Sequence, residues 1–328
     1  MSSGQGVGLD EVDAAARRVY AAMPATPQFA WPLLAARAGR EVWVKHENHT
    51  PTGAFKVRGG LNLVGQLAEL ASPPRGVISA TRGNHGQSLA FAARRAGMRC
   101  TIVVPHGNSP AKNAAMRALG AELVEHGRDF DDARVHAVEL GRDRGDRFVG
   151  PFDRELVAGV ATYARELFAA VAGLDRVYVP IGCGSGICGL IAVRDALGLA
   201  TAIVGVVSTG ADAYRQSFRA GRPIETANAT TIADGMAVRV PVPAALDAIL
   251  RGAEDVVAVT DDEVAEAMRA LFDDTHQVAE GAGAAPLAAA LKAGRQAGER
   301  IGVILSGGNV DRPAYQRILA GGLTGSAA

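Results

Sequence analysis

Apolar and polar residues follow two alternating patterns along the chain. Short runs rich in Val and Ile, in which apolar residues succeed one another without strict alternation, predict strands buried on both faces. Longer segments rich in Ala, Leu and Arg separate these runs and predict helices. The predicted strands span residues 41–47, 76–80, 100–105, 121–126, 176–181, 202–208, 255–260 and 301–306. The predicted helices include residues 87–97, 110–120, 155–171 and 261–274.

Strands that alternate with helices predict an α/β fold with mostly parallel, twisted sheets flanked by helices. The 328 residues are enough for two such lobes. A segment rich in Asp, Arg and Gly at 141–148, followed by Pro151, predicts one crossing between lobes, and we expect the other near 50–56. The expected division is a large domain of residues 1–52 and 153–328 and a small mobile domain of residues 53–152 inserted in it.

Charge and composition narrow the class of partner. Lys+Arg and Asp+Glu both number 34, and this balance argues against nucleic acid or an anionic membrane as a partner. The first 20 residues lack the pattern of a signal peptide, and no apolar run is long enough to span a bilayer. Three cysteines are too few for a disulfide framework, so we expect a cytoplasmic protein.

The densest glycine cluster joins the strand at 176–181 to a following helical segment. Its residues are Gly182, Cys183, Gly184, Ser185 and Gly186. Glycines allow backbone N–H groups to turn toward one point, and the helix N-terminus adds positive potential, so the cluster predicts a phosphate cradle. The loop lacks the Gly-Lys-Ser/Thr of a nucleoside triphosphate site and fits the dinucleotide spacing poorly. A tight turn without a ligand is the alternative.

A second junction follows the strand at 76–80 and reads Thr81, Arg82, Gly83, Asn84, His85 and Gly86. Backbone donors at the start of the next helix suit an anion such as a carboxylate, and the Asn84 amide could bind a ligand oxygen. Asn84 as a plain helix cap is the alternative.

The third junction places Ser306 at the carboxyl end of the strand at 301–306, followed by Gly307-Gly308-Asn309. Ligands of open α/β sheets bind beyond the carboxyl ends of strands, where a serine hydroxyl could bond a neutral ring nitrogen.

Lys56, in the segment PTGAFKVRGG, is either a solvated helix residue or a reactive amine. An amine must lose its proton to act as a nucleophile, and an apolar setting such as that offered by Phe55 favours the neutral form.

These four motifs, in this order, resemble the serine/threonine dehydratase and serine racemase group of fold-type II pyridoxal-phosphate enzymes, whose fold is like that of the tryptophan synthase β subunit. The likeness runs from TPQFAWPLL (26–34) through EGAGAAPLAA (280–289) to SGGN. It implies a homodimer with pyridoxal 5'-phosphate as the cofactor and an amino acid as the substrate.

The resemblance also implies roles for individual residues. Lys56 would bind the cofactor covalently and later take the Cα proton, and Phe55 would pack against the cofactor ring. Asn84 would bond the ring's 3-hydroxyl, residues 182–186 would hold the phosphate, and Ser306 would bond the pyridine nitrogen. The substrate, and in particular its carboxylate, would be bound by the loop that contains Thr81, Arg82, Gly83, Asn84 and His85.

The resemblance implies β-elimination from an L-β-hydroxy-α-amino acid of the threonine or serine type, which releases a 2-oxo acid and ammonia. The chain ends soon after SGGNVD, so we expect no regulatory domain and a catabolic or specialised role. Three alternatives stay open: a dehydratase for a larger or acidic β-substituent (phenylserine or 3-hydroxyaspartate), an amino-acid racemase or β-replacement synthase, and a binding protein without activity.

Two departures from the family pattern bear on these alternatives. Arg82 stands where serine racemase carries an acid/base serine, and a guanidinium that stays charged carries protons poorly. Arg82 is therefore expected to contact the substrate or to form a surface ion pair. Val207 and Ala213 occupy the two acidic positions of metal-binding relatives, so with Asp212 alone nearby we expect no metal site.

Three further groups have plain interpretations. Glu280 matches an acidic position near the cofactor in relatives, and a structural ion pair is the alternative. Cys183 and Cys188 suit small buried residues better than zinc ligands. His46 and His49 either line the entrance or make local hydrogen bonds.

Overall fold

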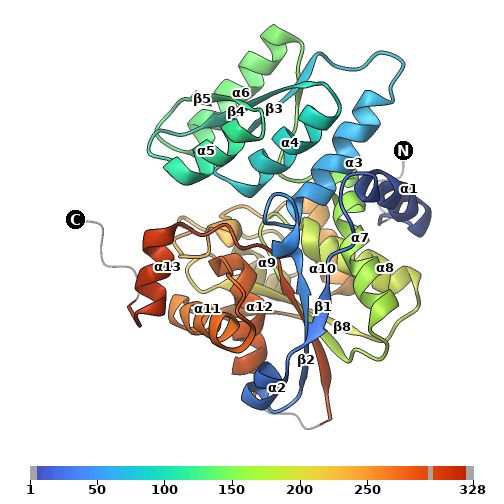
Figure 1. The fold of residues 1–328 in the computed structure, drawn as a ribbon, viewed down its shortest axis with the longest axis vertical. Helices are drawn as coiled ribbons and strands as arrows, with labels where there is room; N and C mark the ends of the chain where they lie inside the picture. Colours follow the sequence, from blue (N-terminus) through green and yellow to red (C-terminus); the bar gives the residue numbers. More distant parts are fainter. Residues whose placement is uncertain (1–5, 295–297, 323–328) are drawn as a thin grey trace. The chain divides into compact units, whose positions relative to one another are not determined.

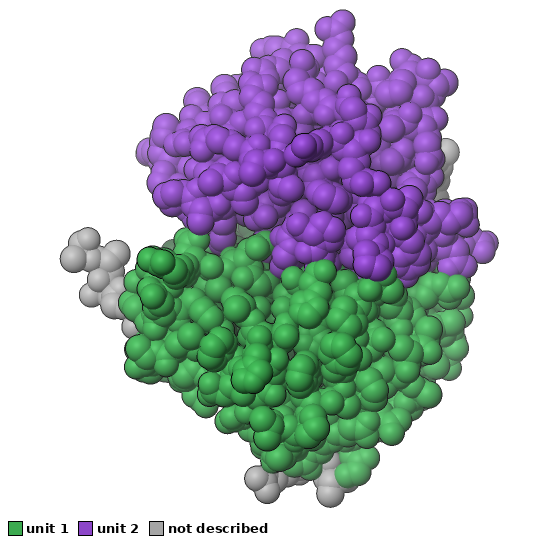
Figure 2. Space-filling model, viewed as in Figure 1, with its two compact units in different colours: residues 1–9, 25–49, 163–328 green, residues 10–24, 50–162 purple. Residues whose placement is uncertain are grey.

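The computed structural model describes residues 6–294 and 298–322. The chain forms two compact units, each with its own sheet. Unit 1 comprises residues 1–9, 25–49 and 163–328, and unit 2 comprises residues 10–24 and 50–162, as coloured in Figure 2. The predicted α/β class with mostly parallel sheets is confirmed. In the part of the chain that is described, no helix combines the length and the apolar character that a membrane crossing needs.

Unit 1 is built on a six-stranded sheet in the order β1-β2-β10-β7-β8-β9. The strands are β1 (Gln28–Ala30), β2 (Glu41–His46), β7 (Arg176–Pro180), β8 (Ala202–Ser208), β9 (Asp255–Val259) and β10 (Arg300–Leu305). β1 pairs antiparallel with β2, and all other neighbours are parallel. Because the parallel strands end at one edge, the loops that follow β7 and β10 begin side by side.

Helices cover both faces of this sheet (Figure 1). Val303 of β10 packs into a core shared with α2, α11, α12 and α13, whereas the neighbouring Gly302 faces Leu167 of α7 on the other side. α8 and α10 pack on each other, and α8 contacts β7 and β8. The bounds are α2 (Pro32–Ala38), α7 (Arg154–Ala170), α8 (Ser185–Ala196), α9 (Ala213–Ala220), α10 (Pro243–Gly252), α11 (Asp261–Thr275), α12 (Gly281–Lys292) and α13 (Arg312–Leu319), with 3₁₀ turns at Glu47–His49 and Asp234–Met236.

Unit 2 has a parallel four-stranded sheet in the order β5-β4-β3-β6. Val77 of β3 packs with α3, α4 and α5 on one face, and the next residue, Ile78, packs with α6 on the other. This alternation explains why the strand is apolar throughout. The elements are α1 (Leu9–Tyr20), α3 (Lys56–Ala68), β3 (Gly76–Ala80), α4 (Asn84–Arg95), β4 (Arg99–Val104), α5 (Pro110–Ala118), β5 (Glu122–Glu125), α6 (Phe130–Arg144) and β6 (Arg147–Phe148).

Helices α3 and α4 approach each other closely at Gly60. A Cβ at Gly60 would lie 2.3 Å from Ser88 Oγ and 2.8 Å from the Ser88 carbonyl oxygen, so only glycine fits there. The same Ser88 hydroxyl donates to the Lys56 carbonyl at 2.6 Å. This contact fixes the backbone of Lys56, the first residue of α3, against α4.

The compact units differ from the expected domains in two places. Residues 10–24 belong to unit 2, and the chain passes from unit 2 to unit 1 within α7, between residues 162 and 163. The segment 141–148 lies inside unit 2, where it completes α6 and forms β6. The proposed insertion of residues 53–152 as a mobile domain stays a prediction.

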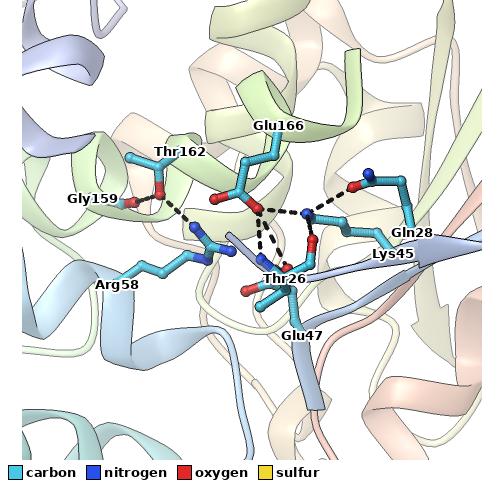
Figure 3. A network of polar contacts seen from close by, with 8 residues as sticks. All are labelled: Thr26, Gln28, Lys45, Glu47, Arg58, Gly159, Thr162 and Glu166. Atoms are coloured by element: carbon cyan, nitrogen blue, oxygen red, sulfur yellow. Dashed lines mark hydrogen bonds and ion pairs between the residues drawn. The ribbon is translucent and has the colours of Figure 1, made fainter. Parts of the chain in front are cut away.

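A buried network of charged groups occurs in unit 1 (Figure 3). Lys45, which has no exposed side-chain surface, donates to Glu166 Oε2 at 2.5 Å, to the Thr26 carbonyl at 2.7 Å and to Gln28 Oε1 at 3.0 Å. The Thr26 hydroxyl donates to Glu47 Oε1 at 2.5 Å. The ammonium of Lys45 thus compensates carboxylate charge that is removed from water.

In unit 2, the buried Arg58 of α3 donates to the Thr162 hydroxyl at 2.9 Å, which donates in turn to the Gly159 carbonyl at 2.7 Å (Figure 3). A Cβ at Gly159 would lie 2.3 Å from the Arg58 carbonyl oxygen. Close packing and hydrogen bonds therefore hold α3 against the first part of α7.

We expect Lys45→Met to lower the free energy of unfolding by about 3–5 kcal/mol, because it leaves buried carboxylate charge without its cation. Chemical denaturation measures this change. Arg117→Met, which removes an exposed pair with Glu125, is the matched control and should have a much smaller effect. Equal effects of the two substitutions would show that the buried network does not matter for stability.

Candidate functional site

The glycine loop of unit 1 leaves the carboxyl end of β7 and enters α8. Gly184 caps α8 with φ 98°, a left-handed conformation that favours glycine, and a Cβ there would lie 2.6 Å from Ala245 Cβ. The amides of the first turn of α8 have no acceptor within the helix. The loop therefore presents N–H groups and the positive end of a helix, as a phosphate requires.

Two buried tyrosines that sequence reasoning missed bind the carbonyl groups of this loop. Tyr214 donates to the Cys183 carbonyl at 3.2 Å, and Tyr163 donates to the Gly186 carbonyl at 2.9 Å. Tyr214 itself accepts from the Val242 amide at 2.9 Å, and burial raises the pKa of its hydroxyl. The two tyrosine hydroxyls thus hold the backbone of the glycine loop and of the first turn of α8 in place.

The segment Asp234-Gly235-Met236 was also missed, and it lies against the glycine loop. A Cβ at Gly182 would be only 2.2 Å from the Gly235 carbonyl oxygen. Gly182 is therefore a glycine because two backbone segments meet there. The Asp-Gly pair is a turn signal that could have drawn attention to this segment.

Ser306 lies at the same sheet edge, one residue beyond β10, which pairs with β7. It is 3% exposed, and within the described residues its hydroxyl makes no hydrogen bond. The next carbonyl, of Gly307, accepts from the Glu280 amide at 3.1 Å, directly before α12. Unit 1 thus brings together the glycine loop, Ser306 and the start of α12 around Glu280.

In unit 2, Lys56 begins α3 after a tight turn. Gly53 has φ 68°, its amide donates to the Thr50 carbonyl at 2.9 Å, and the Thr50 hydroxyl accepts from the Ala54 amide. Lys56 Nζ lies 5.2 Å from the centroid of the Phe55 ring. An aromatic face at this distance attracts the ammonium form, and the expected packing of Phe55 against the cofactor ring stays a prediction.

The loop from Thr81 to Gly86 leaves β3 and enters α4. Gly83, not Asn84, occupies the cap position of α4, and Asn84 is the first helical residue, so the helix-cap alternative for Asn84 fails. The Thr81 hydroxyl accepts from the Gly83 amide at 3.2 Å. His85 is buried, whereas Arg82 is exposed and makes no ion pair or hydrogen bond with any described residue.

The two histidines before the Lys56 turn make local contacts. His46 is fully buried and accepts from the Trp31 indole at 3.0 Å, and burial lowers its pKa to about 4. His49 Nε2 lies 2.6 Å from Gln277 Oε1. These contacts agree with the local-hydrogen-bond interpretation.

The residues considered for metal binding are buried or hydrogen-bonded to neighbouring protein groups. Burial raises the pKa of the Cys188 thiol to about 12, as expected for a small buried residue. Asp212 accepts from the Gln216 amide at 2.6 Å, while Val207 and Ala213 are buried. Within residues 6–294 and 298–322, no three His, Cys, Asp or Glu side chains are grouped to hold a metal ion.

These features define a class of protein: an α/β enzyme that holds a phosphorylated ring cofactor. The fit rests on the glycine loop, whose carbonyls are bound by tyrosines, and on the unbonded Ser306 hydroxyl at the same edge. The description "Pyridoxal-phosphate dependent enzyme" belongs to the family that matches residues 20–307. The chain belongs to this family, and its cofactor is pyridoxal phosphate.

Known relatives are similar over most of the chain. It is 34% identical to the L-threonine ammonia-lyase of Thermotoga maritima over 90% of this chain and 73% of that protein. It is 31% identical to the L-threo-3-hydroxyaspartate ammonia-lyase of Saccharomyces cerevisiae over 94% of both. The solved threonine deaminase isoform 2 of Solanum lycopersicum has a TM-score of 0.89 at 28% identity, over 97% of this chain and 91% of that one. The chain spans only 58% of the length of several biosynthetic L-threonine dehydratases.

Proposed function

We propose that this chain is a pyridoxal-phosphate-dependent ammonia-lyase that acts on an L-β-hydroxy-α-amino acid of the threonine or serine type. The observation that carries the proposal is the similarity over nine tenths of the chain to an L-threonine ammonia-lyase. Water is eliminated first, with loss of the Cα proton and the β-hydroxyl, and hydrolysis of the remaining enamine then gives a 2-oxo acid and ammonia. Ser306 supports this chemistry, because a serine hydroxyl bonds a neutral ring nitrogen without supplying negative charge.

Bound pyridoxal phosphate supplies an electron-withdrawing group that makes the Cα proton acidic. In our proposal Lys56 holds the cofactor and, once its amine is free, takes the Cα proton at Nζ. Residues 182–186 bind the phosphate, Ser306 bonds the ring nitrogen and Asn84 bonds the 3-hydroxyl. The amides of the Thr81–His85 loop bind the substrate carboxylate at the start of α4.

A panel of L-serine, L-threonine, L-threo-3-hydroxyaspartate and L-threo-phenylserine tests the proposal with the purified holoenzyme. We expect 2-oxo acid and ammonia in equal amounts from at least one of them. Chiral analysis of the remaining substrate separates a lyase from a racemase. A D-isomer that forms as fast as the oxo acid would refute the lyase assignment, and no reaction with any substrate would refute the whole proposal.

A substrate with a second carboxylate is the second candidate, and Arg82 favours it. This exposed guanidinium has no carboxylate partner in the described part of the chain and lies in the loop proposed to bind substrate. The similarity to an L-threo-3-hydroxyaspartate ammonia-lyase over 94% of both chains agrees with this candidate.

We expect Arg82→Gln to lower kcat/KM for L-threo-3-hydroxyaspartate by roughly tenfold or more, because a hydrogen bond between charged groups contributes about 1.5–3 kcal/mol. The kcat/KM of the same variant for L-serine, which has no second carboxylate, should fall much less. Arg128→Gln, which removes an exposed guanidinium elsewhere in unit 2, is the control. An equal loss with both substrates would show that Arg82 supports the fold or binds the α-carboxylate that both substrates carry.

We also propose that the protein works as a homodimer in the reducing cytoplasm, in amino-acid catabolism. Its three cysteines are free, which agrees with a reducing compartment. Light scattering of the purified holoenzyme measures the oligomeric state.

A further inference from the structure

His85, the second residue of α4, has an unused ring nitrogen in a buried position. The residue is 5% exposed, and Nε2 has no hydrogen-bond partner among the described residues. A buried polar atom without a partner costs free energy, so such an atom calls for an explanation, and a bound ligand is one.

Contacts on the other side of the ring identify which nitrogen carries the hydrogen. Hydrogen bonding to the backbone of Val149 and Gly150 raises the pKa of the ring, so their carbonyl groups lie beside it. Only an N–H can donate to a carbonyl, and Nε2 has no partner, so Nδ1 is the donor. The Ser79 hydroxyl also donates to the Val149 carbonyl, at 2.7 Å, and fixes its position. The neutral ring therefore carries its hydrogen on Nδ1 and a lone pair on Nε2.

The surroundings keep the ring in this neutral form. Burial, and then the positive charge of Lys56, lower the pKa of His85 to about 3. The start of α4 adds positive potential that acts in the same direction. Ser88, one turn after His85 on the same face of α4, holds the Lys56 carbonyl at 2.6 Å, which explains why Lys56 is near. At any pH where such an enzyme works, Nε2 accepts hydrogen bonds and does not donate them.

The substrate class proposed above offers few groups that could donate to this nitrogen. Its carboxylate oxygens only accept, and its α-amino nitrogen is the group that reacts with the cofactor. The β-hydroxyl is the remaining donor. We propose that His85 Nε2 accepts a hydrogen bond from the substrate β-hydroxyl, so that His85 determines specificity for β-hydroxy amino acids. This inference rests on the proposed function and adds a role for the His85 side chain.

The hydrogen bond has a defined part in the elimination. It selects the rotamer about the Cα–Cβ bond and thereby orients the Cβ–O bond that breaks. His85 does not take the hydroxyl proton, because its ring stays neutral. The Cα proton goes to Lys56 Nζ, and the resulting ammonium supplies the proton with which the β-oxygen leaves as water. His85 therefore acts through orientation and not as a general acid.

Two substrates and two variants test this role in the holoenzyme. L-serine carries the β-hydroxyl donor, whereas 3-chloro-L-alanine loses chloride from the same carbon without offering any donor. His85→Asn keeps an N–H near the Nδ1 position for the Val149 and Gly150 carbonyls and removes Nε2. His85→Gln is the second variant, because its longer amide restores a group near the Nε2 position. His126→Asn, at an exposed histidine of the same unit, is the control.

We expect His85→Asn to lower the ratio of kcat/KM for L-serine to that for 3-chloro-L-alanine by roughly tenfold, the effect of one lost hydrogen bond that leaves a buried donor unpaired. His85→Gln should recover part of this ratio, and His126→Asn should leave it unchanged. A parallel loss with both substrates would overturn the inference, because it would show that His85 supports the fold or acts through Lys56. If the wild-type holoenzyme eliminates from neither substrate, the proposed function fails first.

A measurement without catalysis tests the tautomer on which the inference rests. In protein labelled with ¹⁵N-histidine, we expect the His85 Nε2 signal to be that of an unprotonated nitrogen at neutral pH and to stay so at pH 5. A protonated Nε2 at neutral pH would overturn the inference whatever the kinetics.

Discussion

Lys56→Ala is expected to reduce β-elimination by at least about a thousandfold, because it removes both the group proposed to hold the cofactor and the base for the Cα proton. The variant protein should still fold, since Lys56 begins α3 and its contact with Ser88 uses the backbone carbonyl, which alanine retains. Assays of 2-oxo acid release with L-serine and L-threonine measure the loss, and far-UV circular dichroism monitors the fold.

Lys292→Ala is the matched control. This exposed lysine pairs with Glu263 at 2.9 Å and lies outside the proposed site, so its loss should leave the rate nearly unchanged. A Lys56→Ala protein that keeps a substantial part of the wild-type rate would refute the assignment of Lys56.

Gly182→Ala is expected to weaken binding of pyridoxal phosphate by about a hundredfold. The added Cβ would lie 2.2 Å from the carbonyl oxygen of Gly235, and since this neighbour is backbone, one of the two segments must move. Overpacking of this kind costs about 1–3 kcal/mol, and tenfold in affinity corresponds to 1.4 kcal/mol. Fluorescence titration of the cofactor-free protein with pyridoxal phosphate gives the dissociation constant.

Gly6→Ala adds a methyl group that meets nothing within 4 Å, and it should leave cofactor affinity unchanged. If Gly182→Ala binds the cofactor as tightly as the wild-type protein, then the close approach of Gly182 to Gly235 has no part in shaping the proposed phosphate site.

The predicted strands agree with the structure to within one residue at each end, because a strand of this kind is marked by a contiguous run of residues in the sequence. Apolar β-branched runs such as 202–208 and 76–80 form β8 and β3 with the same bounds. β1 and β6 were missed, because three and two residues are too few to produce a pattern. α12 is buried almost throughout and lacks a polar face, so periodicity could not reveal it.

The candidate site was predictable where a motif is contiguous, as in the glycine loop after β7. Tyr163 and Tyr214 were not predictable, because each reaches its carbonyl partner from a distant helix and no local pattern marks it. The orphaned Nε2 of His85 was equally hidden, since it depends on carbonyls at Val149 and Gly150, more than sixty residues away in sequence.

The most direct test of the account is to locate the cofactor on the chain. Treatment of the holoenzyme with borohydride followed by peptide mass spectrometry would identify the lysine that carries the reduced phosphopyridoxyl group. The chain has four lysines, and we predict that the group lies on Lys56. A group on Lys45, Lys112 or Lys292, or no modified lysine in a protein saturated with pyridoxal phosphate, would contradict it.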